Sequence, residues 1–168
     1  MKTFKGKTIT LSGSLLTIGN KAPDFIAVNG NLETVSLKDY KNSYLLINVV
    51  PSLDTTVCDL QTRTLNEEVF KKDQLDIKVV TLSNDLPFAQ SRWAEKEELE
   101  GIVLLSDYLH HEFGEKYGLY IKENGLLARA AIVLNNKREV IFAQYGTEMS
   151  QHLDYDELLD FINTLPGK

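Results

Sequence analysis

The chain contains one cysteine, Cys58, and its setting suits nucleophilic chemistry. It follows an apolar run that ends at Pro51, and it stands at most four residues after Asp54 and Thr55, which are good N-cap residues. The first amide groups of a helix have no intrahelical partner and the helix dipole is positive there, so this position favours a thiolate. Because the thiolate is the nucleophilic form of cysteine, Cys58 is a candidate reactive thiol.

A largely ionised thiol needs a further cation, because the helix dipole contributes only about 0.3–1 kcal/mol and Asp54 and Asp59 act in the opposite direction. Arg129 interrupts an otherwise apolar predicted strand, and a guanidinium buried there has to find an anion or several acceptors. The Cys58 thiolate would serve, and so would a structural carboxylate. Arg63, five residues along the predicted helix from Cys58, is a second candidate cation.

The simplest alternative is that Cys58 is an inert, small hydrophobic residue of the core. The histidines offer little support for other chemistry. His110 and His111 are adjacent and lack the i, i+4 spacing of a helical metal pair, and His152 lies in a polar segment, so we interpret all three as surface residues. We predict no metal site and no cofactor.

The elements that would position Cys58 alternate between strands and helices. Residues 44–50 are apolar and β-branched, which predicts a central strand buried on both faces, followed by a helix over residues 57–72. Further strands are expected at 75–82, 102–105, 126–134 and 139–145, and further helices at 86–99, 111–117 and 155–165. Residues 3–18 predict a small hairpin that turns at Ser12–Ser14.

This alternation predicts an α/β fold with a mostly parallel central sheet flanked by helices, plus an N-terminal β-hairpin. The functional groove of such a sheet lies at the carboxyl ends of its strands, which is where residues 51–58 follow the most apolar strand. A length of 168 residues without repeat or linker favours a single domain over residues 1–168, with residues 1–18 as a hairpin extension.

The charge composition argues against two classes of binding partner. The chain has 24 acidic and 18 basic residues and a formal net charge of −6, which argues against nucleic acid and anionic membranes as main partners. No apolar segment approaches the roughly 20 residues that cross a bilayer, and no secretory signal is visible. A single cysteine excludes an internal disulfide framework, so a reducing cytoplasm is the expected location.

Three segments of the chain carry a family resemblance. Pro51-Ser52-Leu53-Asp54-Thr55-Thr56-Val57-Cys58 resembles the peroxiredoxin motif Pro-x-x-x-Thr-x-x-Cys. Residues 85–93 resemble the signature of the bacterial thiol peroxidases, an atypical two-cysteine subfamily, and residues 126–130 resemble its arginine strand. The N-terminal hairpin and residues 22–25 are similar too, so the resemblance covers nearly the whole chain.

The resemblance implies a thioredoxin-like fold and the reduction of hydroperoxides. Cys58 would be the peroxidatic cysteine and would become a sulfenic acid. Arg129 would favour the thiolate and polarise the peroxide, and the Thr55 hydroxyl would hydrogen-bond the thiolate and a peroxide oxygen. Pro51 would shield the pocket and limit over-oxidation. Positioned donors of this kind stabilise charge as it develops in a transition state.

The sequence departs from the subfamily at two positions. Thr56 stands where glycine is frequent, and a small local effect is expected. Ala94 stands where the subfamily usually has its resolving cysteine, so an intramolecular disulfide cannot form. Ala94 is either natural, in a one-cysteine variant, or an engineered replacement of a cysteine. In both cases an external thiol, or Cys58 of a second chain, has to resolve the sulfenic acid.

Our leading hypothesis is a cytoplasmic, antioxidant thiol peroxidase that reduces hydrogen peroxide and organic hydroperoxides with thioredoxin or another thiol. The resemblance suggests a homodimer. The alternative is a redox-silent thioredoxin-fold protein that binds a partner or acts as a holdase. A cysteine hydrolase is a weaker hypothesis, because no histidine has an evident route to Cys58 as a general base.

Overall fold

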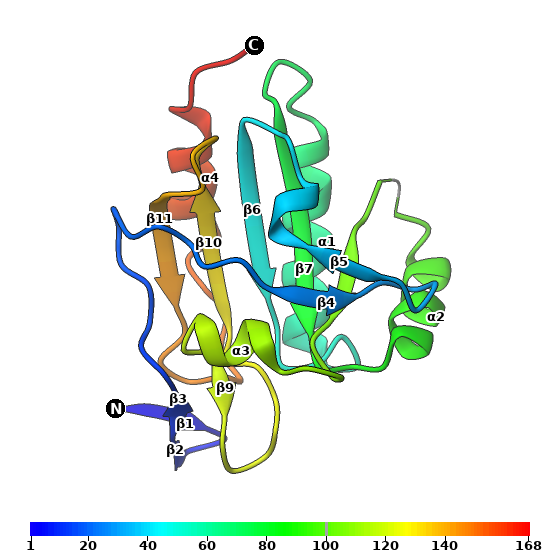
Figure 1. Cartoon of the computed structure of the whole chain (residues 1–168), viewed down its shortest axis with the longest axis vertical. Coiled ribbons are helices and arrows are strands. Elements are labelled where there is room, and N and C mark those ends of the chain that lie inside the picture. Colours follow the sequence, from blue (N-terminus) through cyan, green and yellow to red (C-terminus); the bar gives the residue numbers. More distant parts are fainter. Residues whose placement is uncertain (100) are drawn as a thin grey trace.

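The apolar run after residue 43 forms the centre of the sheet. The computed structural model describes residues 1–99 and 101–168. In it β6 (Tyr44–Val49) pairs with β7 (Ile77–Ser83) on one side and with β10 (Ala130–Leu134) on the other (Figure 1). Residues 45–50 are all buried, which explains why this strand does not alternate between apolar and polar residues.

The sheet is mixed rather than mostly parallel, which corrects the prediction from the sequence. Its seven strands run in the order β11-β10-β6-β7-β8-β4-β5, and only the β6–β7 and β7–β8 pairs are parallel. The two outer pairs are hairpins, and strands joined by a short turn have to be antiparallel. The remaining four strands are β4 (Ile26–Val28), β5 (Thr34–Ser36), β8 (Leu104–Ser106) and β11 (Val140–Tyr145).

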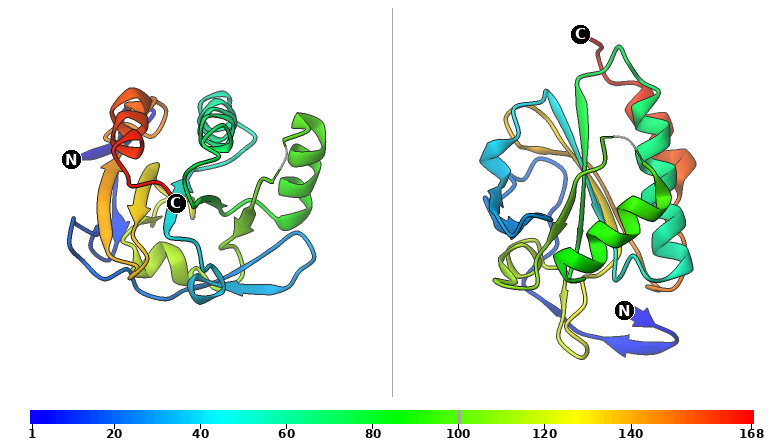
Figure 2. Two further views of the ribbon diagram at one scale, coloured as in Figure 1. Left: turned by 90° about the horizontal axis from the view of Figure 1, so that it is seen from above. Right: turned by 90° about the vertical axis from the view of Figure 1, so that its right-hand side faces the viewer.

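Helices cover both faces of the sheet. Figure 2 shows α1 (Thr56–Phe70), α2 (Pro87–Glu97) and α4 (Tyr155–Asn163) in one layer, with α3 (Glu112–Lys116) and the short 3₁₀ helix η1 (Leu37–Asp39) on the opposite face. Alternate residues of β6 and β10 enter two separate apolar clusters, as the pleat of a strand requires. Within the described residues, no helix combines the length and the apolar character needed to cross a membrane.

The N-terminal hairpin forms, but its turn differs from the prediction. β1 (Lys2–Phe4) pairs with β2 (Lys7–Ile9) around Lys5 and Gly6, which have φ values of 50° and 75°. Positive φ at both central residues is typical of a two-residue hairpin turn. The predicted turn residue Gly13 instead allows a close approach, because a Cβ there would lie 2.6 Å from the Glu115 carbonyl oxygen.

The segment that contains Gly13 therefore belongs to a second small ladder. β3 (Leu11–Ser12) pairs with β9 (Tyr120–Ile121), which follows α3 in the chain. The Glu123 carboxylate accepts from the amide of Thr10 at 2.9 Å and fixes this part of the N-terminal segment.

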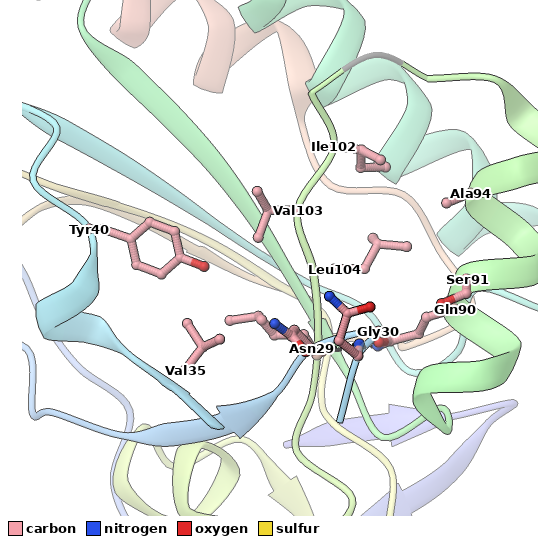
Figure 3. Close-up of a pocket in the computed structure, with 12 residues that line it drawn as sticks. Asn29, Gly30, Val35, Tyr40, Gln90, Ser91, Ala94, Ile102, Val103 and Leu104 are labelled. Carbon is pink, nitrogen blue, oxygen red and sulfur yellow. Dashed lines mark hydrogen bonds between the residues drawn. The ribbon is translucent and has the colours of Figure 1, made fainter. Parts of the chain in front are cut away.

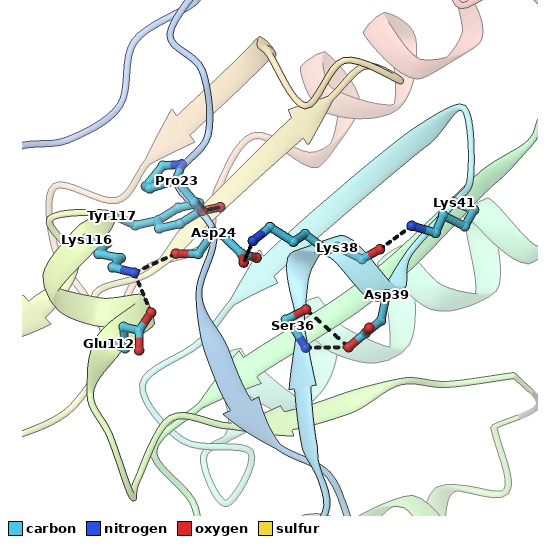
Figure 4. A network of polar contacts seen from close by, with 9 residues as sticks. All are labelled: Pro23, Asp24, Ser36, Lys38, Asp39, Lys41, Glu112, Lys116 and Tyr117. Atoms are coloured by element: carbon cyan, nitrogen blue, oxygen red, sulfur yellow. Dashed lines mark hydrogen bonds and ion pairs between the residues drawn. The ribbon is translucent and has the colours of Figure 1, made fainter.

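Polar contacts attach the start of β4 to η1 and α3 (Figure 4). Asp24 forms an ion pair with Lys38 at 2.8 Å, and its carbonyl accepts from Lys116 at 2.8 Å. The buried Tyr117 donates its hydroxyl to the Pro23 carbonyl at 2.9 Å. Because Lys38 and Lys116 are exposed, the ion pair and the Lys116 hydrogen bond contribute little free energy, and they serve mainly to orient the segment before β4.

A buried carboxyl holds the start of α3. Asp107 is 1% exposed and accepts from the amides of Phe113 at 3.0 Å and Gly114 at 2.8 Å. Burial raises the pKa of Asp107 to about 6, and the two amide donors oppose the rise.

We expect Asp107 to make stability depend on pH. Between its ordinary value of 3.8 and about 6, the folded chain holds a proton that the unfolded chain has lost. The contribution of Asp107 to stability is therefore greatest below pH 4 and falls by about 3 kcal/mol as the pH rises through 6. Asp107→Asn should remove this slope. Urea unfolding of both proteins from pH 4 to pH 7 measures it, and parallel curves would contradict the assignment.

Candidate active site

Cys58 lies in the first turn of α1, directly beyond the carboxyl end of β6. Thr55 is the N-cap residue, so Cys58 is the third residue of the helix. The ladder ends at Val50, whose amide donates to the Leu82 carbonyl at 3.1 Å. The next residue, the buried Pro51, has no amide hydrogen with which to continue the ladder.

Asp85 fixes the loop between β6 and α1. Its carboxylate accepts from the Ser52 hydroxyl at 2.6 Å and from the Leu53 amide at 2.8 Å, and it also accepts from the Ser83 hydroxyl at 2.8 Å. The segment that follows β7 therefore determines where α1 begins. Asp85 belongs to the segment that resembles the subfamily signature, but its residue type does not predict this anchoring contact.

The Cys58 sulfur is enclosed and bonded to a cation. Cys58 is 1% exposed and clusters with Val50 and Leu53, while Trp93 packs against the same cluster. Arg129 donates from Nη2 to the sulfur at 3.3 Å. The structure thus brings together Cys58 and Arg129, as the sequence predicts. Cys58 lies in the helix that follows β6, and Arg129 directly precedes β10, the strand that pairs with β6.

Arg129 itself is 2% exposed, and further acceptors fix its guanidinium. Nε and Nη2 donate to the Met149 carbonyl at 3.0 and 2.6 Å, and Nη1 donates to the Gln61 Oε1 atom at 2.8 Å. Arg129 immediately precedes β10 instead of lying inside it, because the strand begins at Ala130. A guanidinium has five N–H donors. Among the described residues, one hydrogen on Nη1 has no partner.

A buried polar chain continues from Gln61 into the sheet. Gln61 Nε2 donates to Asn48 Oδ1 at 2.6 Å, and Asn48 donates to the hydroxyls of Thr62 and Thr81 at 3.1 Å each. All four side chains are fully buried. Each amide therefore has partners for both its donor and its acceptor, which fixes the orientation of Gln61 toward Arg129.

The second candidate cation does not reach the sulfur. Arg63 bonds Asp59 through Nε at 3.1 Å and Nη2 at 2.8 Å, and lies 3.5 Å from Glu97. Trp93 donates from Nε1 to the same Asp59 at 2.8 Å. These partners hold the pKa of Asp59 below its ordinary value against the opposing effect of burial. Asp59, expected to disfavour a thiolate, is thereby paired with Arg63.

Thr55 occupies the expected N-cap position but makes a different contact from the expected one. Its hydroxyl donates to the Ser52 carbonyl at 2.9 Å. A hydroxyl has one hydrogen, so this bond excludes simultaneous donation to the Cys58 sulfur. Thr55 is exposed, and it lies at the outer side of the first turn that encloses the sulfur.

Ala94 lies on α2 at the wall of a cavity of about 340 Å³ (Figure 3). The cavity is bounded by α2, by the segment leading into β8 and by the turn after β4. Gln90 lines it too. Its Nε2 donates to Ser83 and to the Leu105 carbonyl, at 3.0 and 2.9 Å, and its Oε1 has no partner among the described residues. The cavity-lining residues do not include Cys58.

His152 is connected to the site through Tyr155. His152 contacts the Tyr155 hydroxyl at 2.8 Å through Nδ1. Burial raises the pKa of Tyr155 to about 12; the Arg129 cation opposes this rise and a Cys58 thiolate adds to it. Tyr155, the first residue of α4, is thus within electrostatic range of the cysteine–arginine pair. The sequence predicts Tyr155 only as the start of a helix.

Comparisons with known proteins identify the family of this chain. The chain belongs to the AhpC/TSA family, whose model matches residues 18–143. It is similar to the thiol peroxidase of Bacillus subtilis, at 43% identity over 163 residues and 97% and 96% of the two chains. It is also similar to the thiol peroxidase of Clostridium acetobutylicum, at 46% identity over 156 residues and 93% of each chain.

A solved structure supports the same assignment. The peroxiredoxin-like protein from Aquifex aeolicus superposes with a TM-score of 0.86 at 32% sequence identity, over 96% of this chain and 95% of that one. The expected α/β, thioredoxin-like fold with an N-terminal hairpin is therefore confirmed.

We expect Gln61→Leu to weaken the orientation of Arg129. The substitution leaves a buried N–H of Arg129 unpaired, which should cost about 1–3 kcal/mol of stability. With the guanidinium less fixed, alkylation of Cys58 by iodoacetamide at pH 7 should slow. Gln90→Leu is the matched control, because it removes another buried glutamine that does not contact Arg129. Equal slowing in both variants would show that Gln61 acts only through the fold.

Proposed function

We propose that this chain is a thiol-dependent peroxidase that reduces hydrogen peroxide and organic hydroperoxides. The observation that carries the proposal is the 3.3 Å contact between Arg129 Nη2 and the Cys58 sulfur in the first turn of α1. A buried cation and the positive end of a helix both favour the thiolate. The thiol peroxidases similar to this chain support the same reaction class.

In the proposed reaction, the Cys58 thiolate attacks one oxygen of the peroxide. The sulfur–oxygen bond forms while the O–O bond breaks, and the leaving oxygen takes a proton and departs as water or an alcohol. Cys58 is oxidised to a sulfenic acid. The unpaired hydrogen on Arg129 Nη1 is suited to the peroxide oxygens as negative charge develops on them.

Two other residues have proposed roles in this step. Thr55 would turn its hydroxyl from the Ser52 carbonyl, to which it now donates, toward the thiolate or the peroxide. The buried Pro51 would shield the sulfur from solvent and limit oxidation beyond the sulfenic acid. Both roles depend on a sulfur that stays enclosed while a small peroxide enters.

The sulfenic acid has to be reduced by a thiol from outside the chain, because the sequence contains one cysteine. A first external thiol would form a mixed disulfide with Cys58 and release water. A second thiol would then release reduced Cys58 and carry away the disulfide. Thioredoxin or a small thiol would supply these two electrons, and a reducing compartment such as the cytoplasm contains both.

We also propose a homodimer. Leu86 and Phe88 at the start of α2 are 51% and 63% exposed, and Leu109 in the segment after β8 is 55% exposed. The two segments adjoin, because Ser106 donates to the Asp85 carbonyl at 2.5 Å. Exposed large apolar side chains on adjoining segments suit a subunit interface. Sedimentation equilibrium at micromolar concentration tests this, and a monomer there would contradict it.

Stoichiometric oxidation tests the peroxidase proposal. One equivalent of hydrogen peroxide should add one oxygen to Cys58 rapidly, as detected by mass after trapping with a sulfenic-acid reagent. Arg129→Ala should slow this step by about 100-fold or more, because a preorganised donor is lost. Arg138→Ala is the matched control, since Arg138 donates to the Tyr40 and Asn42 carbonyls instead of the site and should leave the rate within about threefold.

The outcomes of this test separate the two hypotheses. Oxidation of the unsubstituted chain at the rate of a free thiol would exclude a peroxidase and favour a redox-silent binding or holdase protein. Equal slowing in both arginine variants would contradict the role of Arg129 while leaving the reaction itself intact.

Ala94→Cys should change the reductant. After one equivalent of peroxide, the introduced thiol should resolve the Cys58 sulfenic acid as a disulfide, which mass spectrometry detects as the loss of two hydrogens. Multiple turnovers with thioredoxin and its reductase should follow, whereas the unsubstituted chain should turn over only when a thiol attacks Cys58 directly. Failure of Ala94→Cys to form the disulfide would show that position 94 is not a resolving position in this chain.

A further inference from the structure

We infer that Glu148 is a positioning residue for Arg129, and that it acts by clamping the N-terminal hairpin onto the loop whose Met149 carbonyl holds the guanidinium. This inference rests on the proposed function for its importance to catalysis. The hydrogen bonds that connect the hairpin to Arg129 and the Cys58 sulfur do not depend on which reaction the chain catalyses. Among the described residues, neither Glu148 nor the hairpin forms a hydrogen bond with Cys58.

The first step of the connection is the loop that follows β11. Residues 146–150 contribute the Met149 carbonyl, which accepts two of the hydrogen bonds of Arg129. The same loop contributes the Met149 sulfur, which accepts from the Arg129 amide at 3.1 Å, while the Gly146 amide donates to the Arg129 carbonyl at 2.9 Å. A displacement of this loop would therefore displace Arg129.

The second step is the pairing of the loop with the hairpin. The Thr3 amide donates to the Thr147 carbonyl at 2.8 Å, and the Met149 amide donates to the Thr3 carbonyl at 2.8 Å. Lys2 donates from Nζ to the Gly146 carbonyl at 2.5 Å. The Met149 peptide group is thus held on one side by Thr3 of the hairpin, and it holds Arg129 through its carbonyl.

The third step is the carboxylate of Glu148, which joins the two segments. It accepts from the Thr3 hydroxyl at 2.8 Å and from the amides of Lys5 and Gly6, at 2.8 and 3.0 Å, which form the hairpin turn. Within its own loop it accepts from the amide and hydroxyl of Ser150, at 2.9 and 2.5 Å. These donors, Ser150 foremost, hold the pKa of Glu148 well below its usual range.

Amide groups that converge from a turn of this kind form a concave anion-binding site. Here the bound anion comes from the chain itself, and it lies one residue before the carbonyl that orients Arg129. In the described structure the clamp brings five donors to one carboxylate. We conclude that the hairpin is a support for the site rather than an appendage.

The experiment compares three variants of the full chain by the rate of Cys58 alkylation across pH 5–9, which requires no peroxide and no reductant. Glu148→Ala should lower the rate at pH 7 by about three- to tenfold and move the midpoint of the profile upward, a magnitude typical of groups in one hydrogen-bond network. Glu148→Gln, which keeps an acceptor oxygen, should restore part of the rate.

Glu123→Ala is the matched control. Glu123 also fixes the N-terminal segment, through the Thr10 amide, but it has no contact with the loop at 146–150 among the described residues. It should lower thermal stability without moving the alkylation profile. If Glu123→Ala and Glu148→Ala move the profile equally, the effect is general loosening and the inference fails.

A double variant makes the test specific to the connection. If Glu148 acts only through Arg129, Glu148→Ala should have no further effect on alkylation in the Arg129→Ala background. Additive effects would overturn the inference. Because this readout does not involve peroxide, a chain that fails to reduce peroxide could still show the clamp, and a peroxidase could still lack it.

Discussion

The need to satisfy one buried positive charge organises this molecule. Arg129 is 2% exposed, and an unpaired charge at that depth is costly. The fold meets the charge with a sulfur from the first turn of α1, an amide oxygen from the next turn, and the carbonyl of Met149 from the loop after β11. These groups come together only when the strands that carry them have paired, so the geometry of the site is a product of the completed sheet.

The mixed character of the sheet is essential to this arrangement. β10 runs antiparallel to β6, so the beginning of β10 lies beside the end of β6, with Ala130 opposite Val49. Arg129 precedes Ala130 and therefore reaches the first turn of the helix that follows β6. If β10 ran parallel to β6, Arg129 would lie beside the beginning of β6, at the opposite end of the strands from Cys58. The departure from a mostly parallel sheet is what allows the pair to form.

The sequence revealed the residues that violate a local pattern and concealed those that work through the backbone. Cys58 and Arg129 were recognisable because a thiol at a helix start and a charge in an apolar run are both unusual. Met149 holds Arg129 through its carbonyl, and a carbonyl leaves no mark on residue type. Gln61 offered a faint signal, since it lies three residues after Cys58 and so on the same face of the helix. The sequence does not predict the turn at Lys5 and Gly6, because Ser12, Gly13 and Ser14 resemble a turn more strongly.

In the proposed peroxidase cycle, the enclosure of the Cys58 sulfur would affect its oxidation and its reduction differently, because the two reaction partners differ in size. Peroxide is small enough to approach a side chain that is 1% exposed, whereas a protein thiol is not. Reduction of Cys58 by a protein thiol would therefore need the first turn of α1 to move outward, against the two hydrogen bonds by which Asp85 holds Ser52 and Leu53 of the preceding loop. Stronger hydrogen bonds from this loop to Asp85 would protect the reduced sulfur better but would slow the reduction of oxidised Cys58.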